Sequence, residues 1–381
     1  MKYKKVLLLL LTAVLLLLMV SCSDTTTTST STSPSATQTS ASPSATQTST
    51  APTTTTQTTS EVEPIILRWS EGNPEQTALG QIHVQWAKMI EENSNGRIKV
   101  ELYFSGALAS QAERFRSTET GIADISYYAC SIDRSLTPLS LVTSLPFVGM
   151  PADTTKATAI WWDLYNTFPE IQEEWESIVI VSSASMSPTQ LHLTNKEART
   201  PDDIDGMKII STGEQPLTFK AMGAVPVDLG VGDWYTSLDR GLVEGIMNHF
   251  TVIDGFRLLE LLPYHTFFGD EGATIDMSLF IMNKDKWESL PEDLQQVIIE
   301  AGEWQQEAIL ESDISEIQRL IGVSEDAGDT FSYLTEEEIQ QWKDVAKVAH
   351  EEWIAENEAK GLPAREVYDE LLRLIEHYKN Q

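Results

Sequence analysis

Along residues 65–128, segments with one spacing of apolar residues alternate with segments of another spacing. Stretches with every second residue apolar predict strands, whereas stretches with apolar residues three and four apart predict helices. In chain order the pattern gives strand, helix, strand, helix and strand, at Ile65–Trp69, Thr77–Glu92, Ile98–Phe104, Gln111–Thr118 and Ile122–Tyr128. Such alternation is typical of an α/β fold, in which helices cover a parallel or mixed sheet.

The strand pattern returns in the middle of the chain, at Ile178–Ser183, Met207–Ser211, Val225–Leu229 and Val243–Asn248. Between these strands, Thr200–Asp203 combines an N-cap residue, a proline and an acid three residues after the cap. This combination starts helices, and a following glycine ends them. We therefore predict a short helix that ends at Gly206.

The C-terminal part of the chain is predicted to be mostly helical. Ser289–Glu292 and Thr335–Glu338 have the same start signal, and each precedes a stripe of apolar residues at helical spacing. The stripes contain several tryptophans, which we expect in the core: Leu294, Val297, Ile298, Ala301 and Trp304, then Ile339, Trp342, Val345, Ala349 and Trp353.

The N-terminus has the pattern of a secretory signal. Lysines precede an apolar run at Val6–Val20, which is shorter than the roughly 20 residues of a membrane span. Small residues before Cys22 are similar to the bacterial lipobox, in which the cysteine is lipidated and anchors the protein to the membrane. The alternative is ordinary signal cleavage with Cys22 incidental.

Residues 23–60 are almost entirely Ser, Thr, Pro, Ala and Gln, with the segment Ser33–Ser40 repeated at Ser42–Ser49. Such a segment cannot bury enough apolar surface to fold, so we expect a tether. The sequence therefore predicts a signal peptide with lipobox at 1–22, a tether at 23–60 and a folded part at 61–381. The location would be extracytoplasmic, with the protein lipid-anchored or periplasmic.

Charge argues against one class of partner. The chain has a formal net charge of −31 at pH 7, which repels phosphate backbones, so we expect no nucleic-acid partner.

Sequence motifs typical of catalysis and metal binding are also absent. The phosphate loop, the nucleophile elbow and the HExxH motif do not occur, and the histidines lack metal-ligand spacing. Gly230-Val231-Gly232 is best interpreted as a tight turn, because Tyr235 replaces the third glycine of a dinucleotide loop. Cys130, among apolar neighbours, is expected to be a buried thiol. We expect no cofactor, metal or catalytic residue.

An extended resemblance covers roughly residues 64–375. The chain resembles the solute-binding proteins of tripartite ATP-independent periplasmic (TRAP) transporters, the DctP-type family. The resemblance rests on these segments: Ser94–Val100, Phe104–Leu108, Thr120–Ile125, Leu145–Phe147, Thr194–Lys196, Thr200–Lys208, Met222–Val227, Trp234–Leu238, Gly241–Asn248, Met282–Lys284 and Ser289–Asp293.

The resemblance implies a two-lobed α/β fold like that of periplasmic binding proteins. It would have mixed sheets, a ligand cleft between the lobes, and a long C-terminal helical region. We expect interleaved lobes at approximately 61–185 plus 212–250 and 186–211 plus 251–381. The family also implies a small-molecule solute and a two-part membrane permease as partners, and we expect a monomer.

Site residues are implied by the same resemblance. The family's arginine at the end of the Gly-Met-Lys strand is Ile210 here, and a frequent second arginine falls near Gln190. Asn248 matches the family's asparagine, and Tyr235 matches an aromatic residue at the start of a helix. A strand-end turn at Asn248 and core packing of Tyr235 remain the alternatives.

Without the arginine, either the ligand is neutral or another cation replaces the missing charge, because a buried carboxylate needs a partner. Lys208 lies on the same strand face as Ile210 and is the first candidate for the cation, although a solvent-facing side chain is the favoured alternative. His249 and Arg134 are weaker candidates.

Apolar residues near the expected cleft favour a ligand with hydrophobic or aromatic character, hydrogen-bonded by Asn248 and Gln190. We predict weak or no binding of small dicarboxylates and of sialic-acid-like sugars. A ligand-sensing domain for a membrane receptor, or an enzyme on the same fold, are the alternative functions. The apolar residues in question are Ile210, Val231 and Met247, with Trp69 and Tyr128.

Overall fold

A computed structural model describes residues 63–130, 133–212 and 215–380. Contacts divide the chain into two units, 1–60 and 61–381, and all the described residues belong to the second. The predicted signal peptide, the tether and Cys22 lie outside the described residues. Within those residues, no helix combines the length and the apolar character needed to cross a bilayer.

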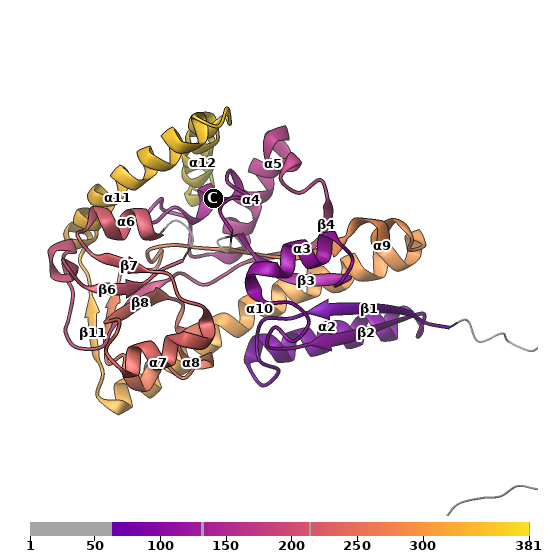
Figure 1. The fold of residues 1–381 in the computed structure, drawn as a ribbon, viewed down its shortest axis with the longest axis horizontal. Helices are drawn as coiled ribbons and strands as arrows, with labels where there is room; N and C mark the ends of the chain where they lie inside the picture. The colour runs from indigo at the N-terminus through magenta and orange to yellow at the C-terminus, as the bar shows by residue number, and fades with distance from the viewer. Residues whose placement is uncertain (1–62, 131–132, 213–214, 381) are drawn as a thin grey trace, which may run out of the picture. The chain divides into compact units, whose positions relative to one another are not determined.

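The first sheet has five strands in the order β2-β1-β3-β10-β4 (Figure 1). β1 lies parallel to β2 and β3, whereas β10 is antiparallel to both β3 and β4. The parallel strands β1 and β3 therefore end at the same edge of the sheet. The strands are β1 (Ile65–Ser70), β2 (Ile98–Tyr103), β3 (Ile125–Ala129), β4 (Ile178–Ser185) and β10 (Met277–Asn283).

The second sheet has six strands in the order β11-β9-β5-β8-β6-β7. β5 is antiparallel to β8 and β9, and the remaining pairs are parallel. The sheet is therefore mixed, as the sequence predicted. Its strands are β5 (Gln190–Leu193), β6 (Lys208–Ile210), β7 (Val225–Val227), β8 (Gly245–Asn248), β9 (Tyr264–Phe267) and β11 (Thr330–Tyr333).

Helices cover both faces of the first sheet. On one face, α2 (Ala78–Asn93) and α10 (Glu292–Ala327) pack against the strands in a core that includes Trp69 and Trp86. On the other face, α4 (Thr154–Thr167) and α12 (Ala364–Lys379) enclose a core that includes Tyr128. Shorter helices near this sheet are α3 (Arg114–Glu119), α5 (Pro169–Glu173) and α9 (Lys284–Glu288).

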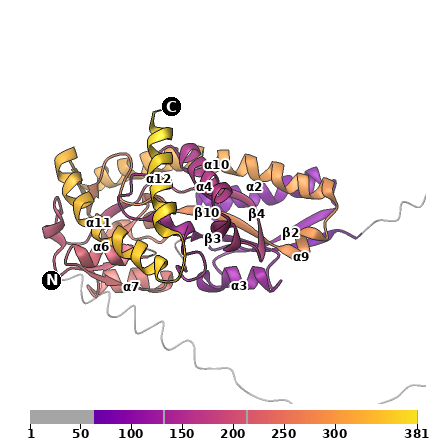
Figure 2. The same ribbon diagram turned by 90° about the horizontal axis from the view of Figure 1, so that it is seen from above.

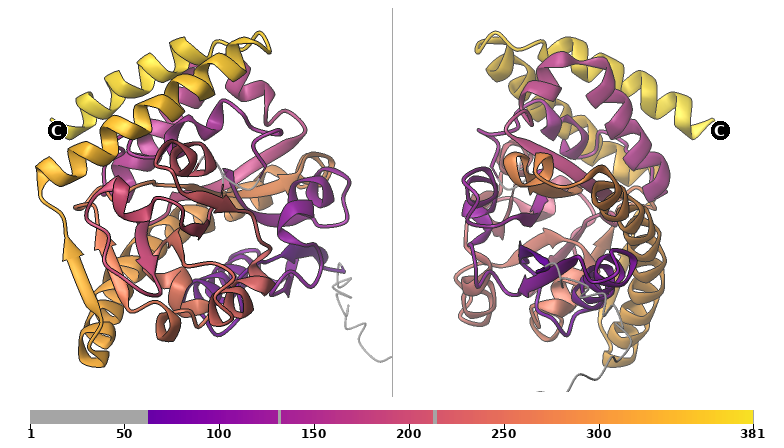
Figure 3. Two further views of the ribbon diagram at one scale, coloured as in Figure 1. Left: turned by 60° about the vertical axis from the view of Figure 1, so that its left-hand side comes forward. Right: turned by 90° about the vertical axis from the view of Figure 1, so that its right-hand side faces the viewer.

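The second sheet is covered in the same way. α6 (Gln215–Ala221) and α11 (Glu336–Glu358) pack on one core, and α7 (Trp234–Asp239) and α8 (Phe250–Gly255) on another. α11 and α12, the two yellow helices, lie side by side in Figure 3. Trp342 and Trp353 on α11 are buried, which confirms their predicted place in the core.

Three connections join the two sheets. The segment that leaves β4 and the segment that enters β10 run next to each other: Met186 N donates to Asp276 O (2.8 Å) and Thr189 N donates to Thr274 O (2.9 Å). The third connection is α10, whose 36 residues span about 54 Å. α10 packs along α2 and β4 and then reaches α8 (Figure 2).

The expected lobe boundaries differ from this topology. Residues 212–250, expected in the first lobe, contribute β7 and β8 to the second sheet, and β10, expected in the second lobe, lies inside the first sheet. β10 has no polar alternation because all seven of its residues are buried, and strands buried on both faces have continuous apolar sequences. The sequence pattern therefore gave no signal for its place.

Helix starts agree with the sequence at two places and differ at a third. Capping boxes are present at Thr200, which precedes the 3₁₀ helix η4 (Pro201–Ile204), and at Thr335, which precedes α11. Ser289 was predicted to start the long helix, but α10 begins at Glu292. The reason is the short helix α9, because Ser289 caps its C-terminus and its hydroxyl donates to Lys286 O.

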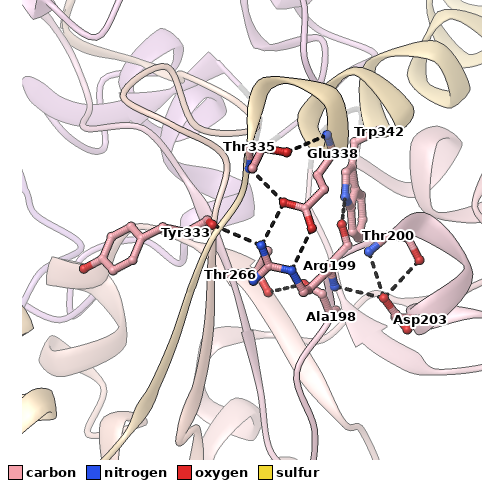
Figure 4. A network of polar contacts seen from close by, with 9 residues as sticks. All are labelled: Ala198, Arg199, Thr200, Asp203, Thr266, Tyr333, Thr335, Glu338 and Trp342. Carbon is pink, nitrogen blue, oxygen red and sulfur yellow. Dashed lines mark hydrogen bonds and ion pairs between the residues drawn. The ribbon is translucent and has the colours of Figure 1, made fainter.

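The two capping boxes are tied together (Figure 4). Arg199 donates to both carboxylate oxygens of Glu338, at 2.7 and 2.8 Å, and its backbone carbonyl accepts from Trp342 Nε1 at 3.0 Å. Asp203 accepts from the backbone N–H groups of Arg199 and Thr200. These contacts fix α11 against the segment that follows β5.

Candidate functional site

A cavity of about 470 Å³ lies between elements of the two sheets. The first sheet contributes the β1–α2 loop, the first turn of α2 and Tyr127 of β3; the second contributes α8 and the turn after it. The middle of α10 and Met186, just after β4, complete the wall. Pockets for small organic ligands typically measure about 300 to 1,000 Å³, so the size suits a small molecule.

The α2 side of the cavity is polar because a helix begins there. Thr77 caps α2 by accepting a hydrogen bond from Gly80 N at 3.1 Å, and Thr77 and Ala78 line the cavity. The N-terminus of a helix carries a partial positive charge. This side of the cavity therefore favours electron-rich groups.

Charged residues of α10 also line the cavity. Arg319 pairs with Glu316 (2.6 Å) and lies 3.6 Å from Asp254 of α8. Asp313 accepts a long hydrogen bond from Ser187 N (3.3 Å), and burial raises the pKa of its carboxyl to about 6. Asp313 forms no ion pair with any described residue.

A buried ion pair lies behind the β1–α2 loop. Glu71 and His83 are both fully buried, and Glu71 Oε2 lies 2.7 Å from His83 Nδ1. Glu71 Oε1 accepts from the backbone N–H and the side-chain amide of Asn73, each at 2.7 Å. Burial alone would raise the pKa of Glu71, but His83 and these hydrogen bonds lower it below its ordinary value. The pair fixes the loop at Asn73, which lines the cavity.

The predicted amides lie side by side but outside the cavity wall. Gln190 of β5 is opposite Asn248 of β8. The Gln190 side chain accepts from Phe268 N at 2.9 Å and is buried, so it holds the backbone after β9. Asn248 is half-buried, accepts from His249 N at 2.8 Å, and directly precedes α8.

Ile210, Val231 and Tyr235 do not line the cavity either. Ile210 is fully buried in the core beneath α7 and α8, and Val231 packs against the same core. Val231 begins the 3₁₀ helix η5 (Val231–Asp233), so Gly230–Gly232 forms the predicted turn between strand and helix. Tyr235 is partly exposed, and its hydroxyl donates to Glu260 at 2.7 Å.

Trp69 and Tyr128 are fully buried on opposite faces of the first sheet. Their neighbours are aromatic: Trp69 contacts Trp86 at 4.4 Å and Tyr128 contacts Phe115 at 5.5 Å between ring centroids. These two side chains form core in this structure. Cys130 is buried, as predicted, and burial raises the pKa of its thiol.

None of the three cations suggested by the sequence supplies a charge to the cavity. Lys208 is exposed, and Arg134 pairs with Glu356 at 2.6 Å. Burial lowers the pKa of His249 to about 4, so its imidazole is neutral near pH 7.

Sequence reasoning missed two charged residues, Asp313 in the cavity wall and Arg114 beside Gly72 of the β1–α2 loop. Both have buried neighbours on their helices: Arg114 directly precedes Phe115 and lies four residues before Thr118, and Asp313 lies four residues after Ile309. A charged residue on a buried face was the available signal, because such residues are rarely buried without a partner. Within the described residues, no three His, Cys, Asp or Glu side chains are placed to hold a metal ion together.

Comparison with protein families gives a match over most of the folded part. The family described as "Bacterial extracellular solute-binding protein, family 7" (DctP) matches residues 69–357. The chain belongs to this family. A second match, to the "New glue protein family", covers residues 1–92, which lie mostly outside the described residues.

Curated relatives are distant. The ectoine-binding periplasmic protein TeaA of Halomonas elongata is 26% identical over 293 residues, 74% of this chain and 81% of TeaA. The C4-dicarboxylate-binding periplasmic protein DctP of Rhodobacter capsulatus is 23% identical over 308 residues, 76% of this chain and 86% of that protein. The chain spans 44% of the length of the uncharacterized protein y4mM of Sinorhizobium fredii, at 27% identity over 64% of this chain.

Solved structures share the fold. A TRAP solute-binding protein of Rhodoferax ferrireducens with copurified benzoate superimposes with a TM-score of 0.75, at 21% identity, over 83% of this chain and 99% of that chain. One from Bordetella bronchiseptica with bound mandelate gives a TM-score of 0.72, at 20% identity, over 82% and 99%. The fold is thus that of two-lobed TRAP solute-binding proteins, as the sequence resemblance implied.

Proposed function

We propose that this chain captures a small organic solute between its two sheets and delivers it to a two-part TRAP permease. The observation that carries the proposal is the cavity, whose wall comes from the first sheet, the second sheet and the connecting helix α10. A ligand that contacts both sheets favours their approach, and binding proteins of this architecture close around a hinge. The paired segments that leave β4 and enter β10 are the proposed hinge.

We further propose that the solute has an apolar or aromatic body and that small dicarboxylates and sialic-acid-like sugars bind weakly. Ile210 in place of the family's arginine supports this proposal. Tyr127, Phe256 and Ile309 in the cavity wall also support it. Two of the distant structures contain benzoate or mandelate, which are aromatic acids. Asn248, next to α8, is the proposed hydrogen-bonding residue, because the Gln190 amide is already bonded to backbone.

The proposed location is extracytoplasmic. In this proposal Cys22 carries a lipid that anchors the protein, residues 23–60 act as a tether, and the protein is a monomer without enzymatic activity. The apolar run before Cys22 and the Ser/Thr-rich composition after it support the anchor.

Mass spectrometry of compounds that co-purify with the protein tests the function. Hits are then confirmed by thermal shift and calorimetry with a panel of aromatic acids, branched acids, dicarboxylates and sugar acids. At a hundred times Kd, a true ligand should add about 2.7 kcal/mol of apparent stability and should reduce the radius of gyration in scattering. Absence of any stabilising compound, or conversion of a bound compound into a product, would contradict a solute-binding role.

A further inference from the structure

Arg114 is a buried cation without a counter-charge in contact. Its side chain is at the start of α3, and the residue is only 4% exposed. Nη1 donates to Tyr127 O at 3.2 Å, Nε has no partner, and no described carboxylate lies within ion-pair distance. A guanidinium has five N–H donors, and leaving the buried Nε–H without an acceptor is unfavourable by about 1 to 3 kcal/mol. Structures keep such a group where a ligand supplies the missing acceptor.

The guanidinium lies at the edge of the sheet where α/β proteins bind ligands. It covers Gly72, two residues after the end of β1, so closely that a Cβ at Gly72 would lie 2.1 Å from Nη2. On the neighbouring parallel strand β3, it lies 5.8 Å from the centre of the Tyr127 ring. Ligands of open α/β sheets bind outside the carboxyl ends of parallel strands. Asn73, next to Gly72, and Tyr127 both line the cavity.

Neutralisation of Glu71 is the competing role for Arg114, because Glu71 is the nearest acid that acts on its pKa. Burial lowers the pKa of Arg114, and the negative charge of Glu71 raises it in part. Oε1 of Glu71 already accepts two hydrogen bonds from Asn73 (2.7 Å each), and Oε2 lies 2.7 Å from His83 Nδ1. No ion pair joins Arg114 to Glu71, and the remaining donors of Arg114 are available.

We propose that Arg114 is the anion-binding residue of the solute site and that it binds one carboxylate of the solute through its guanidinium fork. The proposal rests on the proposed solute-binding function and deepens it. The charge that the family places on the second sheet, at the position of Ile210, is here supplied from α3 of the first sheet. The solute is accordingly an acid whose carboxylate lies near Gly72 and whose apolar body extends into the cavity toward α8 and α10.

Four proteins test the proposal: the parent, Arg114→Met, Arg114→Lys and the control Arg116→Met. Arg116 is on the same helix, is exposed and pairs with Glu119 at 2.7 Å. The probes are benzoate, mandelate and 3-hydroxybenzoate, each with its neutral carboxamide, and affinities are measured by calorimetry. Arg114→Met should bind the acids about 100-fold more weakly than the parent, because it removes one partner of a buried charge pair. The amides should change less than about threefold, since they do not need the charge.

Arg114→Lys should bind the acids with intermediate affinity, because lysine keeps the charge but cannot form the fork. Arg116→Met should match the parent. Thermal unfolding without ligand separates a binding role from a structural one: if Arg114 binds ligand, Arg114→Met should unfold at or above the parent's midpoint. Three results would overturn the proposal and leave solute binding intact. Arg114→Met could bind the acids as tightly as the parent does, or the parent could bind acids and amides equally. The third is a lowered unfolding midpoint of Arg114→Met without loss of affinity. Failure of every probe, with no co-purifying compound, would refute both.

Discussion

The buried pair of Glu71 and His83 gives a strong prediction about stability. His83→Leu removes the imidazole from Glu71 Oε2 while keeping an apolar side chain against Trp69 and Phe280, whose rings lie 5.0 and 5.2 Å from the imidazole. Both members of the pair are fully buried. Breaking a buried ion pair by removing one partner costs about 3 to 5 kcal/mol. Since Glu71 keeps its two hydrogen bonds to Asn73, we expect the lower end, about 3 kcal/mol.

Glu71→Gln should cost less, about 1 kcal/mol, because glutamine can still accept from Asn73 and donate to His83. The matched control is Lys88→Met, which removes an exposed pair with Glu92 on the same helix and should cost less than about 0.5 kcal/mol. Free energies of unfolding come from urea titrations of the ligand-free proteins, followed by tryptophan fluorescence. A free energy of unfolding of His83→Leu within about 1 kcal/mol of the parent's would refute the argument, because removing the partner of a fully buried carboxylate should destabilise the protein more than that.

The same pair predicts a pH dependence. The pKa of Glu71 is lowered in the folded state, so the unfolded state binds its proton more readily. Its stabilisation is therefore complete above the unfolded pKa of about 4.5 and is lost as the pH falls through the lower folded value. Glu71→Gln should lose less stability than the parent between pH 4.5 and pH 3 in the same urea titrations; equal slopes would contradict the assignment.

Two further predictions concern Asp313 and the anchor. The pKa of Asp313 is raised to about 6, so its ionisation destabilises the folded state as the pH rises above its unfolded pKa of 3.8. The free energy of unfolding of Asp313→Asn should therefore exceed that of the parent by about 1 to 2 kcal/mol at pH 7.5. Near pH 4 the two proteins should be equally stable. Thermal scans of ligand-free protein at the two pH values measure this, and an equal difference at both would show that ionisation is not the cause. Cys22→Ser should move the protein from the membrane fraction to the soluble fraction of fractionated cells; identical partitioning of variant and parent would contradict lipidation.

Local features of the fold were predictable from the sequence because neighbouring residues determine them. Capping boxes at Thr200 and Thr335 need only the four residues that form them, and tryptophan stripes at helical spacing identified the core side of α11. The place of β10 depends on pairing with β3 and β4, which lie about 150 and 100 residues earlier. Its apolar sequence fits any buried strand, so the expected lobe boundaries were wrong.

The site was less predictable than the fold. Ile210 marked a missing charge, but its replacement could be found only in three dimensions. Arg114 is separated from Gly72 by an entire helix and strand, and only the parallel pairing of β1 and β3 brings them to one edge. Lys208, the sequence candidate, lies on the correct strand, yet its side chain is exposed.

The position of β10 also determines when the protein can fold. Until residue 283 has been synthesised, β3 and β4 have no strand between them, and the first sheet exists only as two separate halves. The first sheet should therefore stay incomplete while the remainder of the chain is being made. The proposed extracytoplasmic location would benefit from this delay, because a sheet completed early would have to be unfolded again before export. Truncation between β9 and β10 should for the same reason leave the first sheet unformed, although more than half of the chain would be present.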